Sequence, residues 1–212
     1  NRPGVYEAPV GITLRELIDD LGGGVRTGHT LKAVIPGGSS TPVLREQDIV
    51  HAPDEKHPLH AWHGKSHLDV PMGVDTMRGI GTMLGTCCAI VMDDTTSMVR
   101  VAENLMLFYA HESCGQCTPC REGCSWMARL CRKFAAGTAT MNDLEVLNDV
   151  ANNIMGNTIC AFGEGTAMPA LGFLKKFRKD FEAYVRDPKA GKRATLVVEG
   201  ESFLPSHAQA AE

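Results

Sequence analysis

The spacing of apolar residues changes along the chain, and the change predicts two structural parts. After residue 95, apolar residues recur every three or four positions, as on one face of an α-helix. Four such stripes with short connections predict a small antiparallel four-helix bundle over residues 93–187. The stripes are Met98, Val101, Leu105 and Phe108; Met127, Leu130 and Phe134; Leu144, Leu147, Ala151 and Ile154; and Leu171, Leu174, Phe177 and Phe181.

Residues typical of helix ends support this division. Thr140 and Asp143 form a predicted capping box before the third helix, and Gly156 follows that helix. Pro119 stands where the second helix would begin, and we expect Pro169 in the first turn of the fourth.

Residues 1–92 show the pattern of a small α+β domain. Thr13 and Glu16 form a capping box that opens a short helix, and the glycines at 22–24 end it. Short apolar runs between turn residues predict strands at Val5–Glu7, Leu31–Ile35 and Ala89–Met92. Residues 188–212, with a strand-like run at Thr195–Val198, are expected to form a C-terminal tail.

The composition limits the class of protein. Of 212 residues, 43% are hydrophobic and 22% are charged, and the net charge is -4, which is typical of a globular protein. The negative charge argues against nucleic-acid binding, and the longest apolar run, Cys87–Met92, is too short for membrane insertion. Because the chain begins at Asn1 without an initiator methionine, we expect it to be part of a longer protein.

The segment 51–71 is polar and rich in histidine, which predicts an exposed loop. His60, His63 and His67 could bind zinc if they shared a helix face, but Pro58 argues against a stable helix there. A loop without a metal is therefore the expectation for this segment.

The spacing of the cysteines points to metal chemistry. Cys114, Cys117 and Cys120 form Cys-x-x-Cys-x-x-Cys. Disulfides between cysteines three positions apart are strained, whereas thiolates at this spacing converge on one metal centre. A [4Fe-4S] cluster needs a fourth ligand, and the candidates are Cys124 and Cys160.

The predicted helices favour Cys160 as the fourth ligand. If a helix begins near Pro119, Cys124 lies one turn from Cys120 and faces the bundle core, so we predict that Cys124 and Cys131 pack as small apolar residues. Cys160 lies in the loop after the third helix, which can return to the start of the second. Four cysteines could also hold zinc, but three neighbouring ligands and one distant one favour an iron–sulfur cluster.

The cysteine run also resembles a known family. The segment His111–Gly123, HESCGQCTPCREG, with Thr158-Ile159-Cys160 downstream, resembles the NADH-binding flavoprotein subunit of respiratory complex I and the related subunits of NAD-linked hydrogenases and formate dehydrogenases. The segments RPGVYE at 2–7 and IPGGSS at 35–40 resemble the soluble-ligand-binding β-grasp domain of that subunit. The likeness covers about residues 2–185.

The resemblance implies a site and an activity. It implies that Cys114, Cys117, Cys120 and Cys160 ligate a [4Fe-4S] cluster, which takes electrons from FMN after NADH has reduced it and passes them towards quinone. The chain would then belong to an NADH:quinone oxidoreductase, or NADH dehydrogenase. In the family, NADH and FMN bind a domain that precedes the β-grasp region, and no equivalent is found here. We therefore expect this chain alone not to oxidise NADH.

The resemblance also implies partners and a location. The expected partners are other hydrophilic-arm subunits of complex I, including the small [2Fe-2S] subunit and the large iron–sulfur subunit. The expected location is cytoplasmic, at the periphery of the inner cell membrane as part of the complex, without direct insertion into the membrane.

The run Gly79–Gly85 imitates a dinucleotide-binding fingerprint. It follows a polar loop and leads into an apparent strand, whereas a dinucleotide loop follows a strand and opens a helix. It resembles instead a glycine-rich stretch of the same family, in which a glycine pair takes the place of Cys87 and Cys88. We expect these two thiols to pack without a ligand role.

Overall fold

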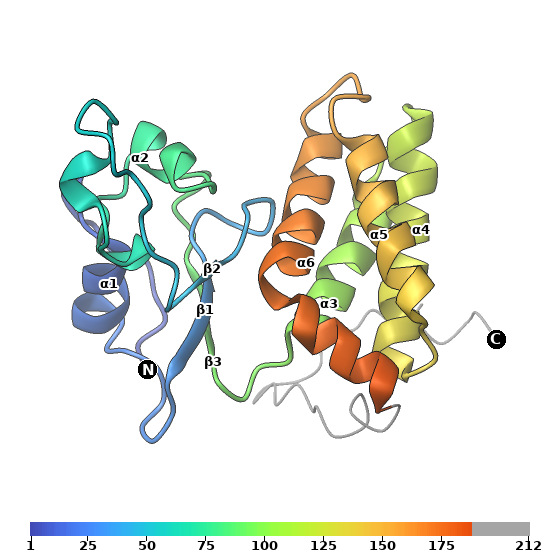
Figure 1. Ribbon diagram of the computed structural model, residues 1–212, viewed down its shortest axis with the longest axis horizontal. Coiled ribbons are helices and arrows are strands. Elements are labelled where there is room, and N and C mark those ends of the chain that lie inside the picture. The colour runs from blue at the N-terminus through green and yellow to red at the C-terminus, as the bar shows by residue number, and fades with distance from the viewer. Residues whose placement is uncertain (188–212) are drawn as a thin grey trace.

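Four long helices form the C-terminal part of the computed structural model, which describes residues 1–187 (Figure 1). They are α3 (Met98–Glu112), α4 (Thr118–Ala136), α5 (Met141–Ile154) and α6 (Phe162–Arg186). Helix α4 contacts α3, α5 and α6, and α6 also contacts α3 and α5. The four segments predicted as helices are therefore helical and pack on one another. The predicted tail, residues 188–212, lies outside the described residues.

The predicted apolar stripes supply most of the core between these helices. Met127, Phe134, Leu144 and Phe181 are completely buried. The rings of Phe134 and Phe181 meet edge to face, with centroids 5.3 Å apart, an arrangement that aromatic pairs prefer. Thr140 and Asp143 form the predicted capping box at the start of α5.

Helix α3 is rotated relative to the predicted stripe. Phe108 is 50% exposed, and the prediction that it faces the core is wrong. Ala102, Met106 and Tyr109 are buried in its place, and their i, i+4, i+7 spacing places them on one face.

Helix α6 begins earlier than its sequence indicates. Pro169 is buried in the interior of the helix, so its predicted place in the first turn is wrong. The backbone of Phe177 is not helical, with φ -123° and ψ 25°, and the helix changes direction there, as the orange-to-red ribbon in Figure 1 shows.

A small antiparallel sheet lies beside the helices. It contains β1 (Leu31–Ile35), β2 (Leu44–Arg45) and β3 (Ile90–Asp93) in the order β2-β1-β3. Val34 in β1 lies opposite Leu44 in β2 and Val91 in β3. Ala33 and Ile35 pack into the core of the helices, whereas Val34 packs into a second core on the opposite face. The strands predicted at 31–35 and 89–92 are thus confirmed.

The second core lies under short helices of the N-terminal part. The capping box of Thr13 and Glu16 opens α1 (Leu14–Glu16), as predicted, which continues as the π-helix η1 (Leu17–Leu21). The other short helices are the 3₁₀ segments η2 (His60–Trp62) and η3 (His67–Asp69) and helix α2 (Val74–Gly79). Buried apolar residues of this core include Leu14, Ile18, Leu44, Leu68, Val70 and Met77.

One prediction for the N-terminal part is wrong, and another holds only in part. Val5–Glu7 is not a strand, and Val5 is fully exposed, because no neighbouring strand pairs with it within the described residues. The segment 51–71 is only partly exposed, because Leu59 and Leu68 anchor it in the second core. The rings of His60 and His63 stack 6.4 Å apart, and the Nδ1 atom of each bonds to the backbone of Ala52.

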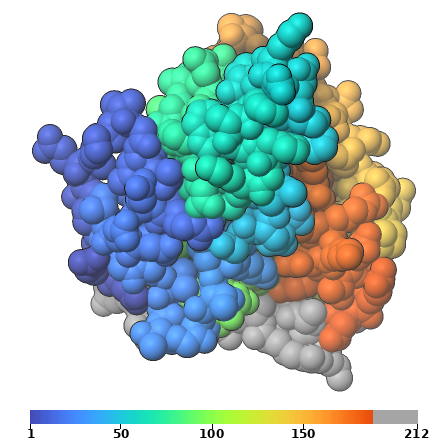
Figure 2. Space-filling model, turned by 60° about the vertical axis from the view of Figure 1, so that its left-hand side comes forward, coloured from blue at the N-terminus to red at the C-terminus, as the bar shows by residue number. Residues whose placement is uncertain are grey.

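Charged residues join the two parts of the chain. Nζ of Lys176 in α6 lies 2.5 Å from Oδ2 of Asp48, and both side chains are largely buried. The Arg45 guanidinium donates to the backbone oxygen of Lys176 at 3.1 Å and pairs with Asp48. In Figure 2 the orange surface of α6 adjoins the blue surface of the N-terminal part. The two cores are therefore held against each other by an ion pair with little access to water.

Candidate metal centre

The three neighbouring cysteines lie where α3 ends and α4 begins. Cys114 is exposed, Cys117 is partly buried as the residue before α4, and Cys120 is buried in the first turn of α4. Gly115 has a positive φ of 78°, which glycine adopts without strain, and it allows the chain to turn between Cys114 and Cys117. Nη1 of Arg121 donates to the oxygen of Gly115 at 2.9 Å and holds this turn against α4.

The loop between α5 and α6 reaches the same end of the helices (Figure 1). The backbone N–H of Ile159 donates to Sγ of Cys117 across 3.4 Å. Cys160, the next residue, is exposed. The sequence-based expectation that this loop returns to the start of α4 therefore agrees with the structure.

Two glycines permit this placement of the loop. A Cβ on Gly163 would lie 2.2 Å from Oγ1 of Thr158, and Oγ1 of Thr158 donates to the oxygen of Cys160 at 2.9 Å. A Cβ on Gly123 would lie 2.6 Å from Cδ1 of Ile154 near the end of α5. Close packing at both ends of the loop thus depends on residues without a side chain.

Cys124 and Cys131 are packing residues, as predicted. Each is only 1% exposed. Sγ of Cys124 lies 3.7 Å from Sγ of Cys120 and donates to Oγ1 of Thr166 at 3.7 Å. Burial raises the pKa of the Cys124 thiol to about 12 and also raises the pKa of Cys131. Both side chains are therefore neutral thiols in the core.

The electrostatics around the three cysteines favour a negatively charged group. Cys117 precedes α4, and Pro119 lies in the first turn as predicted. The N-terminus of a helix carries a partial positive charge, which stabilises thiolates and anionic clusters. Arg121 adds a positive charge, which it shares with Glu122 through an ion pair of 2.9 Å.

Among the described residues, the cysteine sulfurs are not gathered around one point. Zinc held by thiolates at about 2.3 Å brings their sulfurs to within about 4 Å of one another. Within residues 1–187, the groups of three or more ligand atoms that lie within 4.8 Å of one another include only His29, Asp93 and Asp94, and no cysteine. In this structure the cysteine sulfurs are therefore not gathered as in a formed zinc site, where three or four thiolates meet at one ion.

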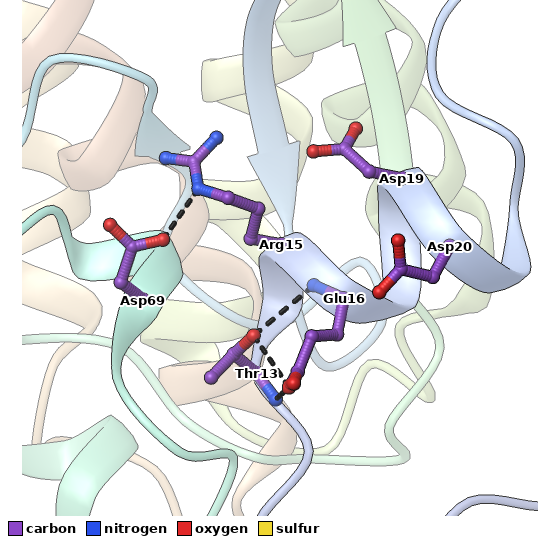
Figure 3. A pocket seen from close by; sticks show the side chains of 6 residues that line it. All are labelled: Thr13, Arg15, Glu16, Asp19, Asp20 and Asp69. Atoms are coloured by element: carbon purple, nitrogen blue, oxygen red, sulfur yellow. Dashed lines mark hydrogen bonds and ion pairs between the residues drawn. The ribbon is translucent and has the colours of Figure 1, made fainter.

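Two further polar features lie away from the cysteines. His29 and Asp94 pair at 2.8 Å, and Asp93 is engaged by Arg26. A hollow of about 320 Å³ lies beside α1 (Figure 3), where the Arg15–Asp69 ion pair and the Thr13–Glu16 capping box stand together. Asp19 and Asp20 complete its acidic lining.

The structure corrects the expectation for Cys87 and Cys88. Both are exposed, so they do not pack as predicted. Cys87 has a positive φ of 59° in a turn closed by its N–H to the oxygen of Leu84. The backbone of Gly85 passes so close to Gly37 that a Cβ would lie 2.1 Å from its oxygen. This contact fixes the turn and directs both thiols outwards. The run Gly79–Gly85 begins at the last residue of α2 and opens no helix, so it lacks the strand–turn–helix context of a dinucleotide loop, as predicted.

Sequence reasoning did not include Ser113 in the site. Its Oγ lies 3.2 Å from Sγ of Cys120. The only signal in the sequence is its position next to Cys114, which does not reveal a contact seven positions away.

Two family models match the chain. The model of the NADH-ubiquinone oxidoreductase-F iron-sulfur binding region matches residues 100–184, and this match supports the predicted [4Fe-4S] cluster. The SLBB domain model matches residues 1–59.

Curated relatives align with most of the chain. The F subunit of the NADH-quinone oxidoreductase of Streptomyces coelicolor is 45% identical over 183 residues, which are 86% of this chain and 36% of the relative. The F subunit of the Rhodobacter capsulatus enzyme is 38% identical over 200 residues, which are 94% of this chain and 42% of the relative. The chain thus spans well under half the length of these relatives.

A solved structure shares the fold. An NAD⁺-reducing [NiFe]-hydrogenase in its H₂-reduced state matches 87% of this chain and 28% of its own, with a TM-score of 0.66 and 29% identity. Within residues 1–187, none of the helices combines the length and apolar character that a membrane span requires. From the curated alignments and the iron–sulfur model, the chain is a homologue of part of the F subunit of NADH-quinone oxidoreductase and includes the iron–sulfur binding region of that family.

Proposed function

We propose that Cys114, Cys117, Cys120 and Cys160 ligate one [4Fe-4S] cluster at the end of an antiparallel four-helix bundle. The observation that carries this proposal is the hydrogen bond of 3.4 Å from the Ile159 N–H to Sγ of Cys117. It brings the residue before Cys160 into contact with one of the three neighbouring cysteines, although the two segments are far apart in sequence.

The role of the site is electron transfer. A [4Fe-4S] cluster accepts and releases one electron at a time. Cys120 and the neutral Cys124 thiol exclude water on the inner side, while Cys114 and Cys160 lie on the exposed side. The exposed side is therefore where an electron donor or acceptor can approach.

The chain works within an NADH:quinone oxidoreductase in this proposal. Electrons come from FMN, which NADH reduces on a region that this chain does not include, and they continue towards quinone. The partners are the small [2Fe-2S] subunit and the large iron–sulfur subunit, at the cytoplasmic face of the membrane. The 38–45% identity to curated F subunits supports this assignment. By this proposal the chain alone does not oxidise NADH.

The corresponding subunit of an NAD-linked hydrogenase is a second candidate. The hydrogenase match, at TM-score 0.66 and 29% identity, favours it, while the higher identity of the F subunits favours the first. Isolation of the native complex with its other subunits separates the two. Hydrogen-dependent reduction of NAD⁺ would support the hydrogenase, and NADH-dependent reduction of a quinone would support the oxidoreductase.

Metal analysis after anaerobic purification tests the site itself. We expect a brown protein with about four irons and four acid-labile sulfides per chain and an EPR signal on reduction. A colourless chain with one zinc would instead indicate a structural site without redox activity, and it would refute the proposal.

A further inference from the structure

Ser113 follows α3 and lies against the most buried sulfur of the proposed site. Its Oγ is 3.2 Å from Sγ of Cys120. The backbone N–H of Ser113 donates to the oxygen of Tyr109 at 3.1 Å, which fixes the backbone at the end of the helix. The backbone of Ser113 is therefore held in place by the end of α3.

The direction of the hydrogen bond follows from the chemistry of the ligand. A cysteine that binds iron is a thiolate without a proton, so its sulfur can only accept. The N–H of Gly115 donates to Oγ of Ser113 at 3.4 Å and occupies a lone pair of that oxygen. The hydroxyl proton remains available for Cys120, and Ser113 donates an O–H···S hydrogen bond.

We propose that Ser113 sets the reduction potential of the cluster through Cys120, an inference that rests on the proposed ligand set. A hydrogen bond to a ligand sulfur stabilises the reduced, more negatively charged form more than the oxidised form, and it thereby raises the potential. Cys120 is only 7% exposed, so solvent screens this interaction little. Ser113 is thus a positioning residue that acts on the ligand.

The other donors near the ligand sulfurs are different in kind. Cys117 receives a backbone N–H from Ile159, which a side-chain substitution does not remove. The Cys124 thiol lies 3.7 Å from Cys120 and donates to Thr166. A thiol is a weaker donor than a hydroxyl. Ser113 therefore provides the side-chain hydrogen bond whose removal changes the potential most.

The test compares Ser113→Ala and Ser113→Thr with the unchanged chain, each purified anaerobically with its cluster. Ser39→Ala is the matched control, because its hydroxyl bonds to Tyr109 at the same end of α3 instead of to a sulfur. The measurements are iron content, an EPR-monitored redox titration, and the coupling of an exchangeable deuteron to the reduced cluster in D₂O.

We expect Ser113→Ala to keep its iron and to shift the equilibrium between the two redox states about tenfold towards the oxidised form, which lowers a one-electron potential by about 59 mV. One exchangeable deuteron coupling should disappear. Ser113→Thr should restore both the potential and the coupling, and Ser39→Ala should change neither.

The possible failures are distinguishable. If the chain without any substitution, purified anaerobically, held no iron–sulfur cluster, the proposed function and this inference would both be refuted. Full iron and an unchanged potential in Ser113→Ala would refute only the role of Ser113. Loss of the cluster from Ser113→Ala would also refute it, because it would make Ser113 a structural residue.

Discussion

The backbone N–H of Ile159 donates to Sγ of Cys117 across 3.4 Å, although 42 positions separate the two residues. Ile159 itself is 86% exposed, so burial of its side chain does not hold the loop in place. The loop is fixed instead by contacts at its ends, above all by the packing of the Thr158 side chain against Gly163. The position of Cys160 therefore depends on residues that would not ligate iron themselves.

Gly163→Ala should displace the loop that carries Cys160. The new Cβ would lie 2.2 Å from Oγ1, 2.5 Å from Cγ2 and 2.8 Å from Cβ of Thr158, so rotation of that side chain cannot relieve the contact. Because supporting contacts typically change metal affinity by about 10–100-fold, we expect at least about tenfold faster loss of iron to a chelator.

Gly165→Ala is the control for this change. It lies on the same helix, and its Cβ would meet Cβ of Ser40 at 3.4 Å, an ordinary contact. Iron loss at the same rate in both variants would show that the Gly163 contact does not position Cys160.

Lys176→Met should weaken the contact between the two cores. The substitution leaves Asp48, which is 8% exposed, with Arg45 as its remaining partner. Removal of one member of a buried pair typically costs about 3–5 kcal/mol, and the Arg45 contact should keep the loss near the lower value. The free energy of unfolding in urea measures this loss.

The double substitution Asp48→Asn with Lys176→Met provides the comparison. It removes the buried carboxylate charge that Lys176→Met leaves with Arg45 as its one ion-pair partner, so it should recover part of the stability lost in Lys176→Met. Equal stability of Lys176→Met and the unchanged chain would mean that this ion pair does not hold the cores together.

Ionisation of Asp93 should make the free energy of unfolding depend on pH in the acid range. Desolvation opposes ionisation, but hydrogen bonds from Thr95 and Arg26 outweigh it and lower the pKa of Asp93 to about 2. Since the pKa is about 3.9 in the unfolded chain, this stabilisation is complete above about pH 4 and is lost as the pH falls towards 2. It amounts to at most about 2.5 kcal/mol.

Asp93→Asn should therefore be less stable than the unchanged chain near neutral pH, and the difference should shrink between about pH 4 and pH 2. Urea unfolding of Asp93→Asn and of the unchanged chain at several pH values measures the difference in their free energies of unfolding and how it changes with pH. A difference that stays constant over that range would rule out ionised Asp93 as its cause.

The sequence predicted features that depend on local pattern. The helical spacing of apolar residues in α4 and α5 is visible in the sequence from residues such as Phe134 and Leu144. Each capping box, at Thr13 and at Thr140, depends on a residue only three positions away. The three-cysteine run is local in the same sense. The predictions of the helices and their caps agree with the structure because the same few residues determine the pattern and the geometry.

Features that depend on distant partners were not predictable in this way. The strand expected at Val5–Glu7 lacks a pairing partner in the described structure, and a strand needs one. Phe108 faces outwards because neighbouring helices select the buried face of α3. Cys87 is exposed because two backbones meet at Gly37, and the contact of Ser113 with Cys120 exists only once α3 and α4 are placed.

The most direct test of the account is the iron content and EPR signal of Cys160→Ser beside Cys124→Ser. Cys124 is the matched control, because it lies 3.7 Å from Cys120 but faces the core. We predict that Cys160→Ser loses the [4Fe-4S] signal and that Cys124→Ser keeps both signal and iron. Retention of the cluster in Cys160→Ser with its loss in Cys124→Ser would contradict the proposed ligand set.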